Sequence, residues 1–211
     1  MLRSNIDKEE INKLPIDAFN GEIVVIDNPE KVTYAMEILR KQKIVGIDTE
    51  TKPAFKKGVI NKIALLQIAT ESQCFLFRLN KIPFPEELAD FLSNKKIKKV
   101  GLATKDDLKG LNGHRKLTPA NVVDLQSIVK NYGILELGLQ KIYALLFEKK
   151  ISKSQRLTNW ENDELTEHQK SYAATDAWST LMIYKKLEKE RKLTKQEIDE
   201  LLLNSEKLTD I

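Results

Sequence analysis

A strand-like segment without polar positions in its interior most constrains the fold of this chain. Residues 43–47 read Lys-Ile-Val-Gly-Ile, and the acidic run Asp48-Thr49-Glu50 follows them. A strand that is apolar on both faces has to be covered on both faces, which is typical of sheets with helices on either side. Other strand-like segments come early in the chain, helical segments lie between them, and helices dominate the end. This order predicts a single α/β domain with a mixed sheet flanked by helices.

The composition agrees with a soluble globular domain and limits the chemistry. The chain has 211 residues, of which 41% are hydrophobic and 31% charged, enough for one substantial core. The net charge of +4 permits a polyanionic partner without requiring one. Cys74 is the only cysteine, which excludes a disulfide framework and a cysteine-based metal site.

Neither an export signal nor a membrane span is expected. Met1 to Glu10 has no apolar core after a basic start, and no run approaches the roughly 20 apolar residues of a membrane helix. Cys74 lies in an apolar strand-like segment, where a buried thiol is expected. These observations predict a cytoplasmic protein without membrane contact.

The remaining elements follow from the hydrophobic pattern and the turn residues. Residues 62–69 and 73–79 are two apolar segments around a short polar turn, which predicts a hairpin. We expect the lysine-rich run 95–99 to be solvated. The chain is divided into an N-terminal arm with little regular structure (1–21), the α/β domain (22–191) and a charged tail with a weak amphipathic helix (192–211). Further strands are predicted at 22–26, 100–103 and 122–124, and helices at 30–41, 86–92, 104–111, 125–131, 137–147 and 166–191.

Two carboxylates lie at the end of the apolar strand. Asp48 and Glu50 are two residues apart, so their side chains project from the same side of the strand. Two carboxylates held close repel each other, and one protonates unless a cation lies between them. Hard divalent cations such as Mg²⁺ and Mn²⁺ take oxygen ligands of this kind. The alternative is a solvated strand end with two acids by chance, but the apolar strand before Asp48 favours a metal site.

A third acid is expected from Asp106 or Asp107. Asp107 borders the apolar face of its predicted helix, together with Leu111, whereas Asp106 shares a face with Lys109 and is expected to face solvent. Thr104 is a natural N-cap, and the helix dipole favours an acid in the first turn even without any chemistry. Capping and metal binding are compatible, and this facing argument selects Asp107.

The fourth acid lies on the long helix predicted near the end of the chain. Tyr172 and Asp176 are four residues apart and lie on one helix face, among alanines that let neighbouring backbone come close. Thr166 and Gln169 have the capping-box spacing, which places the helix start just before Tyr172. A Tyr/Asp pair on a solvated face is common by itself. With the other three acids, however, Asp176 can enclose two cations roughly 3.5–4 Å apart, which would stabilise the attacking and leaving oxygens of a phosphoryl displacement.

These motifs resemble the exonuclease motifs of the DEDD superfamily, in the DEDDy branch that includes ribonuclease D and the Werner-type exonucleases. The tyrosine four residues before the last aspartate marks this branch, whereas the sister branch has a histidine where this chain has Ser171. The resemblance covers about residues 22–190, and residues 53–58 and 62–65 look closer to the Werner-type proteins. The matching residues are Asp48-Thr49-Glu50, Leu66-Gln67, Asp107-Leu108, Lys153-Ser154, Trp160, Leu165, Gln169 and the run from Tyr172 to Trp178.

The resemblance implies a ribonuclease H-like fold and metal-dependent 3′→5′ removal of nucleotides from DNA or RNA, with two divalent cations, Mg²⁺ or Mn²⁺. It implies that Asp48 bridges both cations and that Glu50 and Asp176 complete one site. Asp107 would hold the second cation through water, and Tyr172 would orient the attacking water. The argument from the carboxylates reaches the same residues but assigns neither their roles nor the polarity of cleavage.

Basic residues near these motifs are candidate substrate contacts. Lys56 and Lys57 follow the first motif, and Lys153 and Arg156 precede the last one. A lysine run is more often a solvated face, but both clusters are placed to hold phosphates. Thr49, between the first two acids, is also expected to contact the substrate.

Two questions stay open at this level. Trp160 can stack on a base or anchor a loop on the core, and we favour the anchor. The alternatives to an exonuclease are a catalytically silent module that binds nucleic acid through the same fold, and an unspecific hydrolase of small phosphate esters. All four acids and the tyrosine are present, which favours the enzyme.

Overall fold

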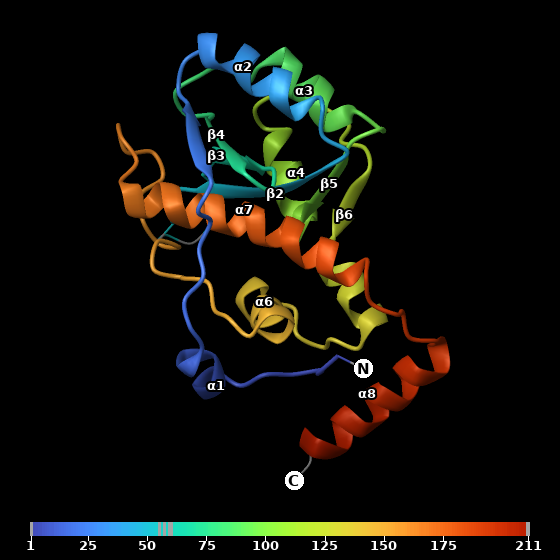
Figure 1. The fold of residues 1–211 in the computed structure, drawn as a ribbon. Coiled ribbons are helices and arrows are strands. Elements are labelled where there is room, and N and C mark those ends of the chain that lie inside the picture. The colour runs from blue at the N-terminus through green and yellow to red at the C-terminus, as the bar shows by residue number, and fades with distance from the viewer. Residues whose placement is uncertain (1, 55, 57, 59–60, 210–211) are drawn as a thin grey trace.

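A mixed β-sheet forms the centre of the molecule. The computed structural model describes residues 2–54, 56, 58 and 61–209. Within this part of the chain, six strands form one sheet in the order β1-β4-β3-β2-β5-β6 (Figure 1). The strands are β1 (Glu22–Ile26), β2 (Ile44–Thr51), β3 (Ile63–Ala69), β4 (Gln73–Arg78), β5 (Lys98–Gly101) and β6 (Val122–Asp124).

The strand directions explain how the chain builds this sheet. β2, β3 and β4 are antiparallel neighbours, and the turn between β3 and β4 is closed by Thr70, whose hydroxyl accepts from the Gln73 amide at 2.9 Å. β1 joins β4 in parallel on one side, and β5 and β6 join β2 in parallel on the other. The predicted mixed sheet and the predicted hairpin are therefore confirmed.

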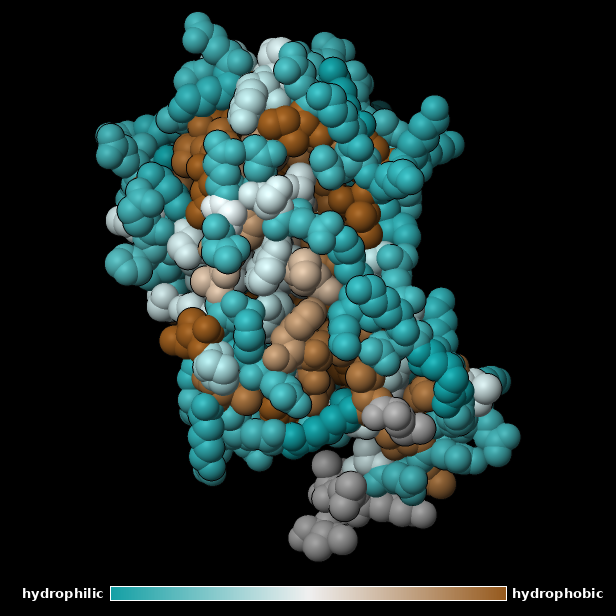
Figure 2. Space-filling view, in the orientation of Figure 1, coloured by the Kyte–Doolittle hydropathy of each residue, from teal (hydrophilic) through white to brown (hydrophobic). Residues whose placement is uncertain are grey.

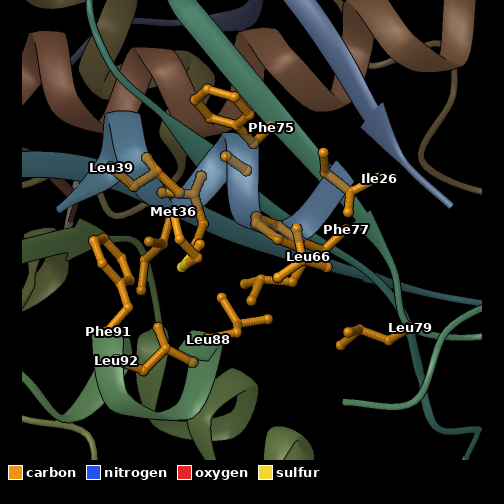
Figure 3. Close-up of a cluster of buried hydrophobic side chains, with 14 of the residues drawn as sticks. Ile26, Met36, Leu39, Leu66, Phe75, Phe77, Leu79, Leu88, Phe91 and Leu92 are labelled. Atoms are coloured by element: carbon orange, nitrogen blue, oxygen red, sulfur yellow. The ribbon is translucent and has the colours of Figure 1, made fainter. Parts of the chain in front are cut away.

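Helices cover both faces of the sheet, as the apolar pattern of β2 predicts. The long helix α7 (Glu167–Leu187) crosses one face, with α6 (Leu139–Phe147) beyond it, and α2 (Glu30–Leu39) and α3 (Glu86–Ser93) lie on the other face (Figure 1). Side chains of α2, α3 and the sheet, among them Met36, Phe77 and Phe91, form the buried core of that second face (Figure 3). The remaining helices are α1 (Lys8–Lys13), α4 (Thr104–Leu111), α5 (Leu125–Ile128), the 3₁₀ helix η1 (Val129–Tyr132) and α8 (Lys195–Thr209).

A glycine lets α7 approach the middle of the sheet. Val45 and Ile47 of β2 point into the core under α2 and α3, so Gly46 between them faces α7. A β-carbon at Gly46 would lie 1.9 Å from the carbonyl oxygen of Ala177. Helix and strand therefore come closer here than any side chain would allow, which brings Asp176 against β2.

The N-terminal arm has more structure than its sequence predicts. It contains α1, where the Asp7 carboxylate caps the helix by accepting from the amide of Glu10. Ile11 and Phe19 are buried, and the Phe19 amide donates to the Thr175 hydroxyl of α7 at 3.0 Å. Isolated apolar residues in a polar segment give no periodic signal in the sequence. In the structure these residues are buried because the arm packs against the rest of the domain.

The expectation that residues 95–99 are solvated is wrong for the last of the four lysines. Lys95 and Lys96 are exposed, whereas β5 begins at Lys98, and Lys99 is completely buried. The Lys99 ammonium donates to the carbonyls of Asn94 and Ile97, and burial lowers its pKa to about 8. A lysine in an inner strand buries its long apolar stem and bonds its charged end to backbone.

Hydrophilic side chains dominate the face of the molecule that Figure 2 shows, with hydrophobic ones in the gaps between them. None of the described helices combines the length and the apolar character needed to span a bilayer. The Cys74 thiol is buried, as predicted.

Candidate active site

The start of α7 is fixed by the capping box that the sequence predicts. The Thr166 hydroxyl accepts from the Gln169 amide at 3.2 Å, and the Gln169 side chain accepts from the Thr166 amide at 3.1 Å. The Gln169 amide group also donates to the Thr158 hydroxyl and to the Asn159 carbonyl. One side chain thus begins the helix and attaches the preceding loop to it.

Three carboxylates from two elements meet where α7 crosses β2. Asp48 and Glu50 extend from the α7 side of β2, and Asp176 extends from α7 itself. One oxygen from each carboxylate can be chosen so that all three lie within 4.8 Å of one another. Asp176 is buried, and the two strand acids are half-buried. A cluster of hard oxygen donors at this spacing fits a divalent cation such as Mg²⁺ or Mn²⁺.

The electrostatics of this cluster also favour a cation. Burial, and then the charges of Asp176 and Glu50, raise the pKa of Asp48 well above its usual range. Burial, and then repulsion from the charges of Asp176 and Asp107, raise the pKa of Glu50 to about 8. Burial raises the pKa of Asp176, although the Tyr172 hydroxyl opposes the shift by hydrogen bonding to the carboxylate. The metal-free cluster therefore retains protons near neutral pH, and a bound cation would replace them.

Tyr172 lies one turn before Asp176 and borders the three carboxylates. Its hydroxyl donates a hydrogen bond to Asp176, and burial together with the nearby acids raises its pKa, so the phenol stays neutral. The ring of Trp160 lies beside it, with ring centroids 6.0 Å apart. Trp160 is completely buried, so it anchors its loop and does not present a face to a base, as we favoured.

Asp107 reaches toward this site from α4. Asp107 is half-buried and Asp106 is exposed, which agrees with the facing argument. The Asp107 carboxylate accepts a hydrogen bond from the Thr49 hydroxyl. Burial raises the pKa of Asp107 to about 6, although this hydrogen bond acts to lower it. Its charge in turn raises the pKa of Glu50. Asp107 lies outside the group of three carboxylates, and its metal role stays a prediction.

The predicted N-cap of α4 is wrong. Ala103, in the left-handed region with φ 54°, occupies the N-cap position, and Thr104 is already helical. The carboxylate of Asp124, at the end of β6, accepts from the amides of Ala103 and Thr104 at 3.0 and 2.9 Å. The acid that accepts hydrogen bonds from the amides at the start of α4 is thus 20 residues away in sequence, so a local sequence pattern does not identify it.

Three of the five predicted substrate contacts line two pockets beside the acids. Lys153 and Arg156 line one pocket together with Tyr172 and Asp176. The charge of Lys153 opposes the rise in the pKa of Asp176, and the charge of Arg156 opposes the rise in the pKa of Glu50, so both basic side chains act on the cluster.

Thr49 lines the second pocket, with Asp107. Lys52, which sequence reasoning did not select, lines the same pocket, although it belongs to the basic loop that contains Lys56. Lys56 is exposed, and Lys57 lies outside the described residues. Gln126 and Leu137 line the first pocket and were also missed, because neither stands near a recognisable motif.

The fold and the site together define an α/β domain, built on a six-stranded mixed sheet, with a cluster of acids that could hold a metal ion. Residues 23–192 match the family model described as 3'-5' exonuclease. The chain belongs to this family, and the family assignment made from the sequence motifs is confirmed.

Relatives identified by sequence agree with this assignment. The chain is 33% identical over 195 residues to the mouse bifunctional 3'-5' exonuclease/ATP-dependent helicase WRN, a match that covers 82% of this chain and 13% of the relative. It is 32% identical over 146 residues to a 3'-5' exonuclease of Arabidopsis thaliana, covering 66% and 51%. The chain therefore spans about half or less of the length of these relatives.

Solved structures confirm the fold. The Nibbler EXO domain of Aedes aegypti superimposes with a TM-score of 0.72 at 21% identity, covering 82% of this chain and 91% of that domain. Escherichia coli RNase D gives a TM-score of 0.72 at 23% identity, covering 79% and 44%. The predicted ribonuclease H-like architecture is thus confirmed.

Proposed function

We propose that this chain removes nucleotides one by one from the 3′ end of a nucleic acid by metal-dependent phosphodiester hydrolysis. The observation that carries the proposal is the meeting of Asp48, Glu50 and Asp176 within 4.8 Å, with Tyr172 hydrogen-bonded to the last of them. Such a cluster is costly to bury unless it has a cationic partner. Membership of the 3'-5' exonuclease family supports the direction of cleavage.

Four acids would hold two divalent cations in this proposal. Asp48, Glu50 and Asp176 would surround one, and Asp48 and Asp107 would hold the second, Asp107 through water. When bound, the cations supply positive charge at the attacking and leaving oxygens of the displacement. The hydrogen bond from Thr49 would keep the Asp107 carboxylate turned toward the site.

The other side chains would orient the reactants. The one proton of the Tyr172 hydroxyl is directed at Asp176, so its oxygen would accept a hydrogen bond from a water molecule and hold that water in line with the scissile phosphate. Lys153 and Arg156, in the pocket next to Tyr172, would bind the phosphates of the strand being shortened. Thr49 and Lys52 line the pocket on the other side of the acids and would contact the terminal nucleotide.

A labelled-oligonucleotide assay tests this function. Pure protein with 5′-labelled DNA and RNA, single-stranded and recessed, should give a ladder that shortens from the 3′ end when Mg²⁺ or Mn²⁺ is added. RNA belongs in the panel because RNase D of Trypanosoma brucei, which has the same fold at 19% identity, was crystallised with RNA U12. The variant Asp48→Asn should lose the ladder, whereas Asp90→Asn, at an exposed acid outside both pockets, should keep it.

The outcomes separate the candidate functions. Binding without cleavage on every substrate would favour the silent nucleic-acid-binding module. Hydrolysis of mononucleotide esters without any ladder would favour the small-ester hydrolase. A ladder that is unchanged in Asp48→Asn would contradict the assigned site.

A further inference from the structure

A buried amide next to the acid cluster has no hydrogen-bond partner. Gln67 of β3 is completely buried, and neither its Nε2 nor its Oε1 bonds to any described residue. An unpaired amide in an apolar core is unfavourable, so each one requires an explanation. Strand β3 is otherwise nearly all apolar, and a leucine or methionine at this position would serve the core better.

The strand register places this amide beside Asp48. Gln67 pairs directly with Asp48 across the antiparallel β2–β3 ladder. Directly paired side chains point to the same face, with β-carbons about 4.5–5.5 Å apart. Along β3 and across β4, the neighbours of Gln67 on this face are Leu65, Ala69 and Leu76, which are all apolar. On β2, Asp48 is the polar side chain paired directly with the amide, whereas Glu50 lies on the more distant diagonal.

We infer that Gln67 is a positioning residue for Asp48, whose carboxylate its Nε2–H group holds while that carboxylate binds the cations. The inference rests on the proposed function, since it assigns a role within the same site. A carboxylate that binds a cation keeps lone pairs free, and a donor behind it fixes its orientation. An amide suits this place because it donates without adding a charge that would compete with the cation.

Metal binding measured without nucleic acid tests the inference. Gln67→Met keeps the length and apolar stem of the side chain but removes the donor. We expect the Kd for Mn²⁺, measured by titration calorimetry, to rise about 10- to 100-fold. The melting temperature without metal should stay the same or rise, because the unpaired amide is gone. Leu76→Met is the matched control: it lies in the same row, one strand further from Asp48, and should leave the Kd unchanged.

Other results would overturn the inference. An unchanged Kd for Mn²⁺ in Gln67→Met would do so, as would a lowered melting temperature with normal Mn²⁺ binding, which would indicate a structural amide bonded to buried water. If the methionine variant does not fold, Gln67→Leu provides the same comparison. Mn²⁺ binding by the unmodified protein tests the metal site of the proposed function separately, and the ratio between variant and unmodified protein tests Gln67 alone.

Discussion

At the scale of single residues, the Tyr172 hydroxyl can be removed with little change in packing but a large expected effect on the proposed chemistry. Tyr172→Phe keeps the ring beside Trp160 but loses the hydrogen bond to Asp176. We expect kcat for the oligonucleotide to fall by about 100-fold or more, because the hydroxyl that would position the attacking water is lost. Single-turnover kinetics would measure this. Tyr143→Phe removes another buried hydroxyl, which donates to Asp17 at 2.8 Å, and should leave kcat unchanged.

The raised carboxyl pKa values predict how the stability of the metal-free protein depends on pH. Folding raises the pKa of Glu50 to about 8 and that of Asp107 to about 6, both above the values of an unfolded chain. Between about pH 4 and 8 the folded state therefore binds more protons than the unfolded state, so the free energy of unfolding should fall as the pH rises.

Thermal unfolding across this range, without and with Mn²⁺, checks that sign. Without metal the melting temperature should drop toward pH 8. Glu50→Gln should make this drop smaller, because it removes one carboxyl group whose pKa is raised in the folded state. Saturating Mn²⁺ should raise the melting temperature most at the upper end, where fewer protons compete for the ligands. A metal-free protein that becomes more stable from pH 5 to 8 would contradict the prediction.

At the scale of elements, the contact between α7 and β2 decides whether the three acids meet. Gly46→Ala would place a β-carbon 1.9 Å from the Ala177 carbonyl oxygen, so the helix has to move away from the strand. We expect a loss of about 1–3 kcal/mol in the free energy of unfolding, from urea titration, and weaker Mn²⁺ binding. Gly138→Ala, where an added β-carbon meets no atom within 4 Å, is the control and should cost less than about 1 kcal/mol.

The same elements show how far sequence reasoning reaches. The start of α7 was predictable because Thr166 and Gln169 satisfy each other within one turn. The cap of α4 was not, because Asp124 supplies it from another strand. The acids Asp48 and Asp176 were found from their spacing, but the reason that they meet is the close approach at Gly46, which depends on the three-dimensional packing.

At the scale of the whole molecule, the sheet order and the arm were the parts least accessible to sequence reasoning. Each strand was predicted from its own pattern, whereas the order in the sheet depends on pairings between distant segments such as β1 with β4. The arm has no regular pattern in the sequence, because its few apolar residues, such as Phe19, are buried only when the arm packs against the rest of the domain.

The small net charge of the molecule determines which side chains we expect to bind nucleic acid. The net charge is only +4, so binding should depend on a few well-placed cations and not on a general positive surface. Lys153 and Arg156 line the pocket next to Asp176 and are the described cations that act on the acid cluster. Each should release about one counterion when it contacts a phosphate, which sets the dependence of binding on salt.

Binding titrations over a range of salt concentrations, in Ca²⁺ to avoid cleavage, measure this dependence. Lys153→Gln and Arg156→Gln should each weaken binding of a single-stranded oligonucleotide and reduce the slope of log K against log salt by about 0.7 to 0.9. Lys96→Gln removes the same charge at an exposed site outside both pockets and should leave the slope unchanged. Equal slopes for all three variants would mean that net charge, and not the pocket beside Tyr172, holds the strand. A reduced slope for the pocket variants alone would place the path of the backbone along the loop that Trp160 anchors to the core.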